Sequence, residues 1–312
     1  MPTPTGAANE MGDTVMLGLE LRDNLAVAVG LDDAGRVLAR AAIRSAPDLG
    51  AAACAALDTV AAASVGSLTS VGVAALAPET HDCRYALQAI ARRYVGPFLQ
   101  DGAMPSGAAA AVAEAWTGAA AGARDVVFFS AAEHTAAGMI LAGVPWLGAH
   151  GRAATAAWLA LNPVEREDYR RTGCLEAEVA AAGIVRRLVW RIKAGDQSHV
   201  EEVVNGDLAA ITVAHVLDAA RQRDGVSISV VRDTAKYLGM AAANMVVLVD
   251  PDVLVLGGVM ASAADLLLEP IRAELGRRLP LPMMQALTIV PAVLGEDAAA
   301  IGAARTSAVG VQ

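Results

Sequence analysis

The hydrophobic pattern of the N-terminal third predicts three strands followed by alternating helices and strands. The three predicted strands span residues 15–21, 24–32 and 36–43. A turn signal at residues 32–35, Asp-Asp-Ala-Gly, joins the second strand to the third as a hairpin. A helix follows, with Asp48 as its N-cap, and then come a strand at 68–76 and a helix at 83–95.

The rest of the chain repeats this order, with strands first and alternating helices and strands after them. After an Ala-rich helix at 107–122, a strand at 125–131 leads into two strands around a tight turn at Ala142-Gly143. A mostly helical stretch at 173–249 then precedes the next strand, which ends on two glycines. Two halves that each open with antiparallel strands and continue as β/α units indicate a duplicated α/β fold with a ligand cleft between the halves.

The strand at 252–258 ends on Gly257 and Gly258, and a helix-like stretch follows at 263–279. A glycine pair permits a positive φ in a tight turn, and it also lets a ligand lie against bare backbone. The dipeptide alone favours the turn.

Composition excludes several classes of protein. Hydrophobic residues make up 55% of the 312 residues, but the longest apolar tract, 239–259, is interrupted by Asp250, Pro251 and Asp252, so we expect no membrane span. Residues 1–14 contain no Lys or Arg and no apolar core, which predicts a disordered tail and not a secretory signal. We therefore expect a cytoplasmic protein.

Charge and cysteine content exclude further classes. A net charge of -9 without a basic cluster argues against nucleic acid as a partner, because phosphate neutralisation requires a basic face. Cys54, Cys83 and Cys174 are odd in number and far apart, which predicts reduced thiols, at least two of them buried.

Four segments resemble the ROK family, which comprises bacterial sugar kinases and sugar-responsive repressors with the actin-like ATPase (ribonuclease H-like) fold. They are residues 235–275, 293–304, 111–130 and the sequence Gly-Cys-Leu-Glu-Ala at 173–177. The resemblance implies an N-terminal lobe of residues 15–118 plus 296–312 and a C-terminal lobe of residues 119–295. It also implies a homodimer.

The resemblance locates a nucleotide site whose residues have changed. Gly257 and Gly258 match the element that approaches the adenosine, and Glu20 stands where the kinases have the Asp of the first phosphate loop. A Glu at that place is typical of the repressors. Arg22, Asp23 and Asn24 replace the small residues of that loop.

The second phosphate loop of the family is rich in glycine, whereas this chain has Ser-Ala-Ala-Glu-His-Thr-Ala-Ala-Gly at residues 130–138. Only Gly138 fits the family pattern. Glu133 and His134 occupy glycine positions, and an acidic loop opposes a triphosphate. Glu20, Gly138, Gly257 and Gly258 are therefore interpreted as the remnant of a nucleotide site.

The catalytic base of the kinases is an Asp in an Asn-Asp pair at the start of a helix. An ungapped alignment from Trp116 places that pair on Ser106-Gly107, so the base is missing. No residue is assigned as catalytic. Asp101, in a loop that is longer than in the family, is the candidate for a substitute base.

The family's sugar and zinc site is also altered. Thr155 and Trp158 replace a Glu and a His, and we interpret Trp158 as filling the former sugar pocket. Cys174 alone remains of the Cys-rich loop, so no zinc is expected because the metal needs four ligands. Glu176 is the remaining sugar-contact carboxylate; an acid near a helix N-terminus is otherwise an ordinary feature.

These observations lead to three hypotheses. The first is a catalytically degenerate, sugar-kinase-like protein that senses or scaffolds and binds a sugar or nucleotide. The alternative is an ATP-dependent sugar kinase of the glucokinase or N-acetylhexosamine kinase class, built on Glu20, Asp101 and Glu176; ATP and Mg²⁺ are implied only in that case. The third is a repressor, but some 14 residues before the first strand leave no room for a DNA-binding domain, so direct DNA binding is not expected.

Overall fold

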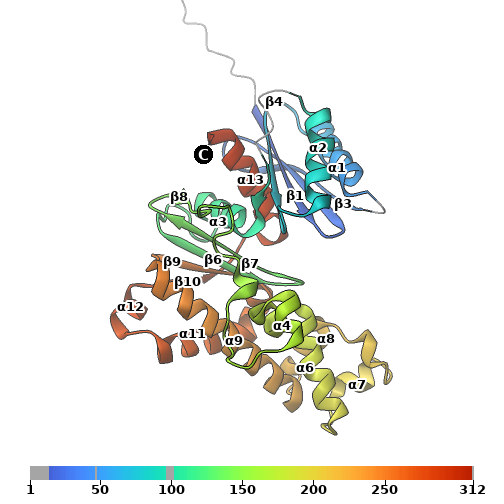
Figure 1. The fold of residues 1–312 in the computed structure, drawn as a ribbon, viewed down its shortest axis with the longest axis vertical. Coiled ribbons are helices and arrows are strands. Elements are labelled where there is room, and N and C mark those ends of the chain that lie inside the picture. Colours follow the sequence, from blue (N-terminus) through green and yellow to red (C-terminus); the bar gives the residue numbers. More distant parts are fainter. Residues whose placement is uncertain (1–13, 46–47, 96–101, 311–312) are drawn as a thin grey trace, which may run out of the picture. The chain divides into compact units, whose positions relative to one another are not determined.

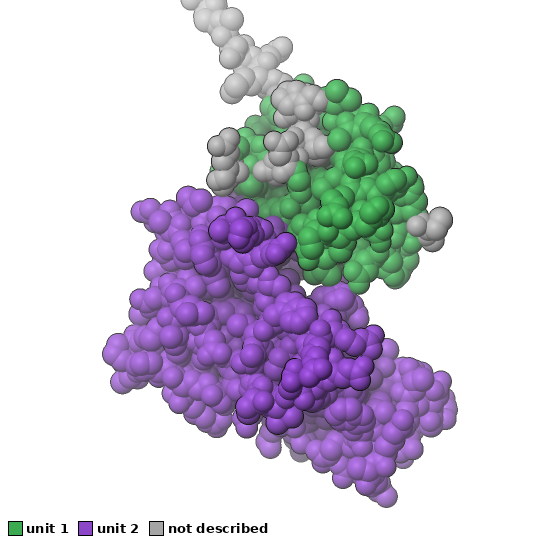
Figure 2. All heavy atoms as spheres, viewed as in Figure 1, with its two compact units in different colours: residues 1–104, 300–312 green, residues 105–299 purple. Residues whose placement is uncertain are grey.

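The computed structural model describes residues 14–45, 48–95 and 102–310. The chain divides into two compact units, residues 1–104 with 300–312 and residues 105–299 (Figure 2). The sequence-based division at residues 118 and 296 differs from this one because the helix α3 (Ser106–Trp116) groups with the second unit. Of the predicted tail, residues 1–13 lie outside the described residues, and Thr14 begins the first strand.

The first unit is built on a five-stranded sheet with the order β3-β2-β1-β4-β5 (Figure 1). Its strands are β1 (Thr14–Arg22), β2 (Leu25–Leu31), β3 (Val37–Arg44), β4 (Ser67–Ala75) and β5 (Met104–Pro105). β1 pairs with β2, and β2 with β3, in antiparallel fashion, whereas β1 and β4 are parallel. The predicted order of three strands, a helix, a strand and a helix is confirmed.

Helices cover both faces of this sheet. Leu17 and Leu19 of β1 point to a buried core shared with α1 (Leu49–Ala63) and α2 (His81–Arg93), and Asp48 caps α1 as predicted. Gly18, on the opposite face, packs against α13 (Ala298–Val309), where a Cβ would lie 1.9 Å from the Ala300 carbonyl oxygen. Because side chains alternate along a strand, Leu17 and Leu19 fill the core on one face of β1. Gly18 on the other face leaves room for the backbone of α13.

The second unit repeats the strand order of the first, as β8-β7-β6-β9-β10. Its strands are β6 (Val126–Ala131), β7 (Thr135–Leu141), β8 (Val144–Pro145), β9 (Val253–Gly258) and β10 (Thr288–Pro291). β6–β7 and β7–β8 are antiparallel, and β6–β9 and β9–β10 are parallel. Ala142 and Gly143 both have positive φ in the predicted turn. The predicted duplicated α/β fold is confirmed.

A helical layer packs against this second sheet (Figure 1). After η1 (Ala156–Trp158) it comprises α4 (Glu167–Thr172), α5 (Cys174–Val179), α6 (Ala181–Lys193), α7 (His199–Val203), η2 (Leu208–Ala210), α8 (Val213–Arg221) and α9 (Gly225–Val249). Beyond β9 come α10 (Val259–Ser262), α11 (Ala264–Arg278), α12 (Leu281–Ala286) and η3 (Gly295–Asp297). The long helix α9 is capped by the buried Asp224 and packs along α11.

Two further sequence predictions can be compared with the fold. Cys54, Cys83 and Cys174 are unpaired, and the last two are buried, as expected. Burial raises the pKa of the Cys83 thiol to about 11, so this thiol is protonated at neutral pH. Within the described ranges, no helix combines the length and apolarity needed to cross a bilayer.

Candidate functional site

Glu176 on α5 is anchored to the hairpin that joins β6 and β7. Its Oε2 accepts hydrogen bonds from the Thr135 backbone N–H at 2.8 Å and from the Thr135 hydroxyl at 3.0 Å. Its Oε1 lies 3.1 Å from Nδ1 of His134, and the Glu176 side chain is 15% exposed. The carboxylate that the resemblance assigns to sugar binding is therefore held by two hairpin residues.

These contacts set the protonation state of Glu176. Burial disfavours the ionised carboxyl, but the hydrogen bonds from His134 and Thr135 outweigh it, and the pKa of Glu176 falls below its ordinary value. The group is ionised at neutral pH. It can accept a hydrogen bond from a ligand hydroxyl, but it cannot donate a proton.

Gly173 lets the start of α5 pack against η1, the segment that carries the aligned Trp158. Its φ is +92°, and a Cβ on Gly173 would lie 2.1 Å from the Ala157 carbonyl oxygen, so η1 and the start of α5 meet backbone to backbone. Trp158 does not fill an internal pocket in this unit, because its indole is 57% exposed. η1 and α5 are therefore neighbours in the fold, with Trp158 at the surface, and a sugar site there stays a prediction.

The β6–β7 turn lacks the glycines expected of a phosphate loop. Ala131 pairs with Thr135, the Ala132 N–H donates to the His134 carbonyl at 2.9 Å, and Glu133 is exposed between them. Gly138 lies inside β7, where a Cβ would come within 2.2 Å of the Gly107 carbonyl oxygen. The close packing of β7 on α3 therefore explains this glycine without a nucleotide.

Gly257 and Gly258 are likewise required by packing. Gly258 has a φ of +61°, and a Cβ there would lie 2.0 Å from the carbonyl oxygen of Ala131 on the neighbouring strand. A Cβ on Gly257 would lie 2.9 Å from the ring of Phe128. The strand ends on two glycines because its backbone turns sharply against β6. A role in nucleotide binding stays a prediction.

The remaining predicted residues lie apart from Glu176 in the chain. Glu20 is buried on β1 of the first unit and is paired with Arg22, whose Nη2 lies 2.7 Å from Glu20 Oε2. Asp23 and Asn24 form the two-residue turn to β2. Asp101 lies outside the described residues.

Sequence reasoning missed Glu114, which is 0% exposed on α3. Its Oε2 accepts the Ala119 N–H at 2.7 Å, and its Oε1 accepts the N–H groups of Val293 and Leu294 at 3.1 and 3.0 Å. One carboxylate thus connects the end of α3 to the segment after β10. The available signal was a single charge in an otherwise uncharged helix, Ser-Gly-Ala-Ala-Ala-Ala-Val-Ala-Glu-Ala-Trp.

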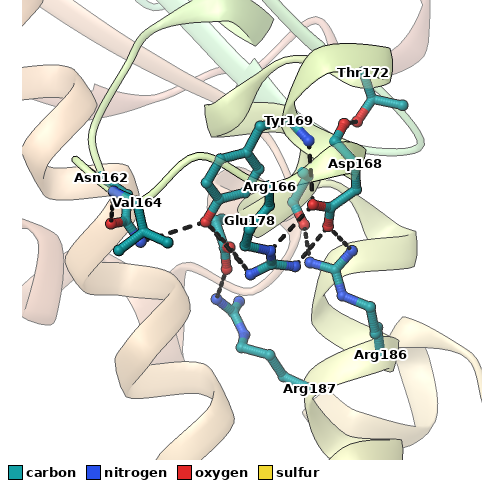
Figure 3. A network of polar contacts seen from close by, with 10 residues as sticks. Asn162, Val164, Arg166, Asp168, Tyr169, Thr172, Glu178, Arg186 and Arg187 are labelled. Carbon is teal, nitrogen blue, oxygen red and sulfur yellow. Dashed lines mark hydrogen bonds and ion pairs between the residues drawn. The ribbon is translucent and has the colours of Figure 1, made fainter.

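The segment that replaces the Cys-rich loop is held by ion pairs (Figure 3). Arg166 contacts Asp168 through Nη2 at 2.5 Å and Glu178 through Nη1 at 3.0 Å. Arg187 contacts the other Glu178 oxygen at 3.2 Å, and Arg186 contacts Asp168 at 2.7 Å. This network, Arg166, Asp168, Tyr169, Glu178, Arg186 and Arg187, joins the segment before α4 to α5 and α6.

Aromatic residues complete this network. The Tyr169 hydroxyl donates to Glu178 at 2.5 Å, and burial together with this carboxylate raises the pKa of Tyr169 to about 12. The guanidinium of Arg166 lies 4.7 Å from the Tyr169 ring centroid. In the part of the chain that the structure describes, no three His, Cys, Asp or Glu residues cluster as metal ligands. The absence of zinc stays a prediction.

Comparison with known proteins agrees with the fold. The family model described as "ROK family" matches residues 106–307. This chain belongs to the ROK family. A glucokinase from Halalkalibacterium halodurans is 30% identical over 198 residues, which are 62% of this chain and 59% of that protein. The DNA-binding transcriptional dual regulator NagC of Escherichia coli is 28% identical over 52% of this chain and 39% of its own length. The aligned region thus spans less than two thirds of these relatives.

Solved structures show the same ROK fold. A ROK family glucokinase from Streptomyces griseus, in complex with glucose and AMPPNP, has a TM-score of 0.78 at 23% identity and covers 93% of this chain and 98% of its own. A ROK family transcriptional regulator, homologous to the Escherichia coli MLC protein, has a TM-score of 0.82 at 20% identity over 97% of this chain and 79% of its own. The actin-like ATPase fold is therefore shown, and the sugar-kinase-like family includes both kinases and repressors.

Proposed function

We propose that this ROK-family chain is a catalytically degenerate, sugar-kinase-like protein that senses or scaffolds and binds a small sugar or nucleotide ligand. The observation that carries the proposal is the start of α3. The first turn of this helix contains no acidic residue, and the aligned positions are Ser106 and Gly107. A sugar kinase needs a group there that accepts the proton of the attacking hydroxyl.

The packing of α3 supports the same proposal. Ser106 is buried, and Gly107 lies so close to β7 that a Cβ would be 2.1 Å from the Ala137 carbonyl oxygen. The only acid on α3 is Glu114, whose two oxygens bind three backbone N–H groups. A fully buried carboxylate with these partners is unsuited to take a substrate proton.

The residues aligned with the family's second phosphate loop and sugar site also support a loss of catalytic activity. Glu133 places a negative charge at the tip of the β6–β7 turn, where it opposes a polyphosphate. The Glu176 side chain is 15% exposed, and both of its oxygens already have partners. Such a group suits binding of a sugar hydroxyl more than a catalytic step.

The alternative function is an ATP-dependent sugar kinase with an atypical site. It is favoured by the 30% identity to a glucokinase and by the kinase structures with the same fold. In that case Glu20, Asp101 and Glu176 would act together with ATP and Mg²⁺, with Asp101 as the base.

Ligand-dependent melting temperature tests the binding part of the proposal. A ligand that binds only the folded protein at about 100 times its Kd adds about 2.7 kcal/mol of stability. We expect glucose, N-acetylglucosamine or AMPPNP to raise Tm, and we expect Glu176→Gln to reduce a sugar-induced shift while Glu165→Gln, an exposed acid on the same unit, does not. No shift with any of these compounds contradicts ligand binding.

A further inference from the structure

A second hollow lies on the helical layer of the second unit and is separate from the Glu176 site. It has a volume of about 610 Å³, which is the size of a small-molecule pocket. Its charged lining comes from the segment before α4 and from α5, α6, α9 and α11, and comprises Arg166, Glu178, Arg187, Asp233, Lys236 and Arg278. Glu178 and Glu176 are two residues apart on α5, so their side chains point to different faces of the helix.

The charge of this hollow is opposite to that of the whole chain. Four cationic side chains face two carboxylates in a protein of net charge -9. Arg166 and Arg187 share Glu178, Arg166 also pairs with Asp168, and Arg278 pairs with Glu274. Arg186 and Arg277 pair with the same two further carboxylates, so six cations face four carboxylates when these partners are counted. The hollow therefore has an excess of about two positive charges.

Two of the cations can contact a ligand directly. Lys236 on α9 is exposed, and among the described residues no acid forms an ion pair with it. Arg278 uses Nε and Nη2 for Glu274, which leaves Nη1 for another acceptor. Arg187 is only 13% exposed, and burial lowers its pKa, so a nearby anion would stabilise its charged form.

An aromatic and apolar wall completes the hollow. Trp190 on α6 is 52% exposed although Arg186 and Arg166 lie 5.0 and 5.6 Å from its ring centroid. Tyr237 and Met240 of α9 line the same space. An exposed indole next to cations suits a ligand with both a ring and an anionic group.

We propose that this hollow binds a phosphomonoester that carries an aromatic or other apolar ring, with Lys236 and Arg278 on the phosphate and Trp190 on the ring. A phosphomonoester carries a charge of about -1.5 to -2 near pH 7, which matches the local excess of positive charge. Arginine and lysine are the usual phosphate ligands in proteins. The proposal does not rest on the proposed function, because it uses none of the residues assigned to sugar or nucleotide binding.

Isothermal titration calorimetry at constant ionic strength tests this site with three probes. Phenyl phosphate carries both the ring and the phosphate, inorganic phosphate carries only the charge, and phenol carries only the ring. We expect phenyl phosphate to bind most tightly and phenol to show no saturable binding. Trp190→Ala is expected to weaken phenyl phosphate but not inorganic phosphate.

The chain contains two lysines, which provide a matched pair of variants. Lys236→Gln is expected to weaken phenyl phosphate by about tenfold, because a charge-assisted contact is lost. Lys193→Gln makes the same charge change on the exposed end of α6, outside the hollow, and is expected to leave Kd unchanged. Asp233→Asn removes an opposing carboxylate and is expected to tighten binding about threefold or more.

Three results would overturn the proposal. The first is no saturable binding of phenyl phosphate below about 10 mM. The second is equal weakening by Lys236→Gln and Lys193→Gln, or no weakening by either. The third is loss of binding in Glu176→Gln with no effect of Lys236→Gln, which would place the probe at the sugar-site elements.

Discussion

Replacement of Glu178 by Ala is expected to destabilise the second unit strongly, because this buried carboxylate joins three partners (Figure 3). Its Oε1 accepts from Tyr169 at 2.5 Å and from Arg166 at 3.0 Å, and its Oε2 accepts from Arg187 at 3.2 Å. The substitution removes three hydrogen bonds to a charged group. It also leaves Arg187, whose side chain is 13% exposed, without its carboxylate.

The size of the effect follows from these contacts. Hydrogen bonds to a charged group contribute about 1.5–3 kcal/mol each, but the cost of burying the carboxylate offsets part of their sum. Removal of one partner of a buried ion pair costs about 3–5 kcal/mol, and we expect Glu178→Ala to fall in that range. For a unit of this size the loss corresponds to a decrease in Tm of about 6–20 °C.

Circular dichroism melting at a fixed protein concentration measures this decrease. Glu178→Gln keeps the shape of the side chain and removes the charge, so it is expected to give a smaller loss than Glu178→Ala. Glu165→Ala serves as the control because Glu165 and its partner Arg170 are exposed, and no measurable change is expected. If Glu178→Ala melts within about 2 °C of this control, the network does not hold the segment and the reasoning fails.

Three further predictions concern metal, pH and assembly. Elemental analysis of the purified protein is expected to show no stoichiometric zinc, because one Cys remains where the family has a Cys-rich loop; one zinc per chain would refute this. The pKa of Glu176 is lowered in the folded protein, so its contribution to stability is present above its unfolded pKa, about 4.5, and is lost as pH falls through the lower folded value. The Tm difference between wild type and Glu176→Gln should therefore be largest near neutral pH and should shrink below about pH 4; a difference that grows on acidification would show the opposite sign. Light scattering is expected to give a homodimer, and a mass near 31.7 kDa at all concentrations would exclude it.

The fold was predictable from sequence because its signals are local. Alternation of apolar residues defined the strands, Asp48 marked the start of α1, and Ala142-Gly143 marked the β7–β8 turn. These features depend on residues within a few positions of one another. The duplication was predictable because the two halves of the chain show the same order of predicted strands and helices.

The site was less predictable because its contacts join distant residues. Glu178 meets Arg166 twelve residues away, and Arg187 donates to Thr234 forty-seven residues away. The periodic spacing of apolar residues along the chain does not predict such pairs. Gly138 fitted the end of a phosphate loop by alignment, whereas the structure gives it a packing role within β7 that only the position of α3 reveals.

Sugar-dependent release of ADP is the measurement that tests the central claim, the absence of phosphotransfer, most directly. A panel of hexoses and N-acetylhexosamines is assayed with ATP and Mg²⁺, with wild type beside Asp101→Asn. We predict no sugar-dependent turnover in either protein, because the first turn of α3 lacks an acid and Glu133 opposes the phosphates. Turnover of about 1 s⁻¹ or more in the wild type, abolished by Asp101→Asn, would contradict the account and make the protein a sugar kinase with Asp101 as its base.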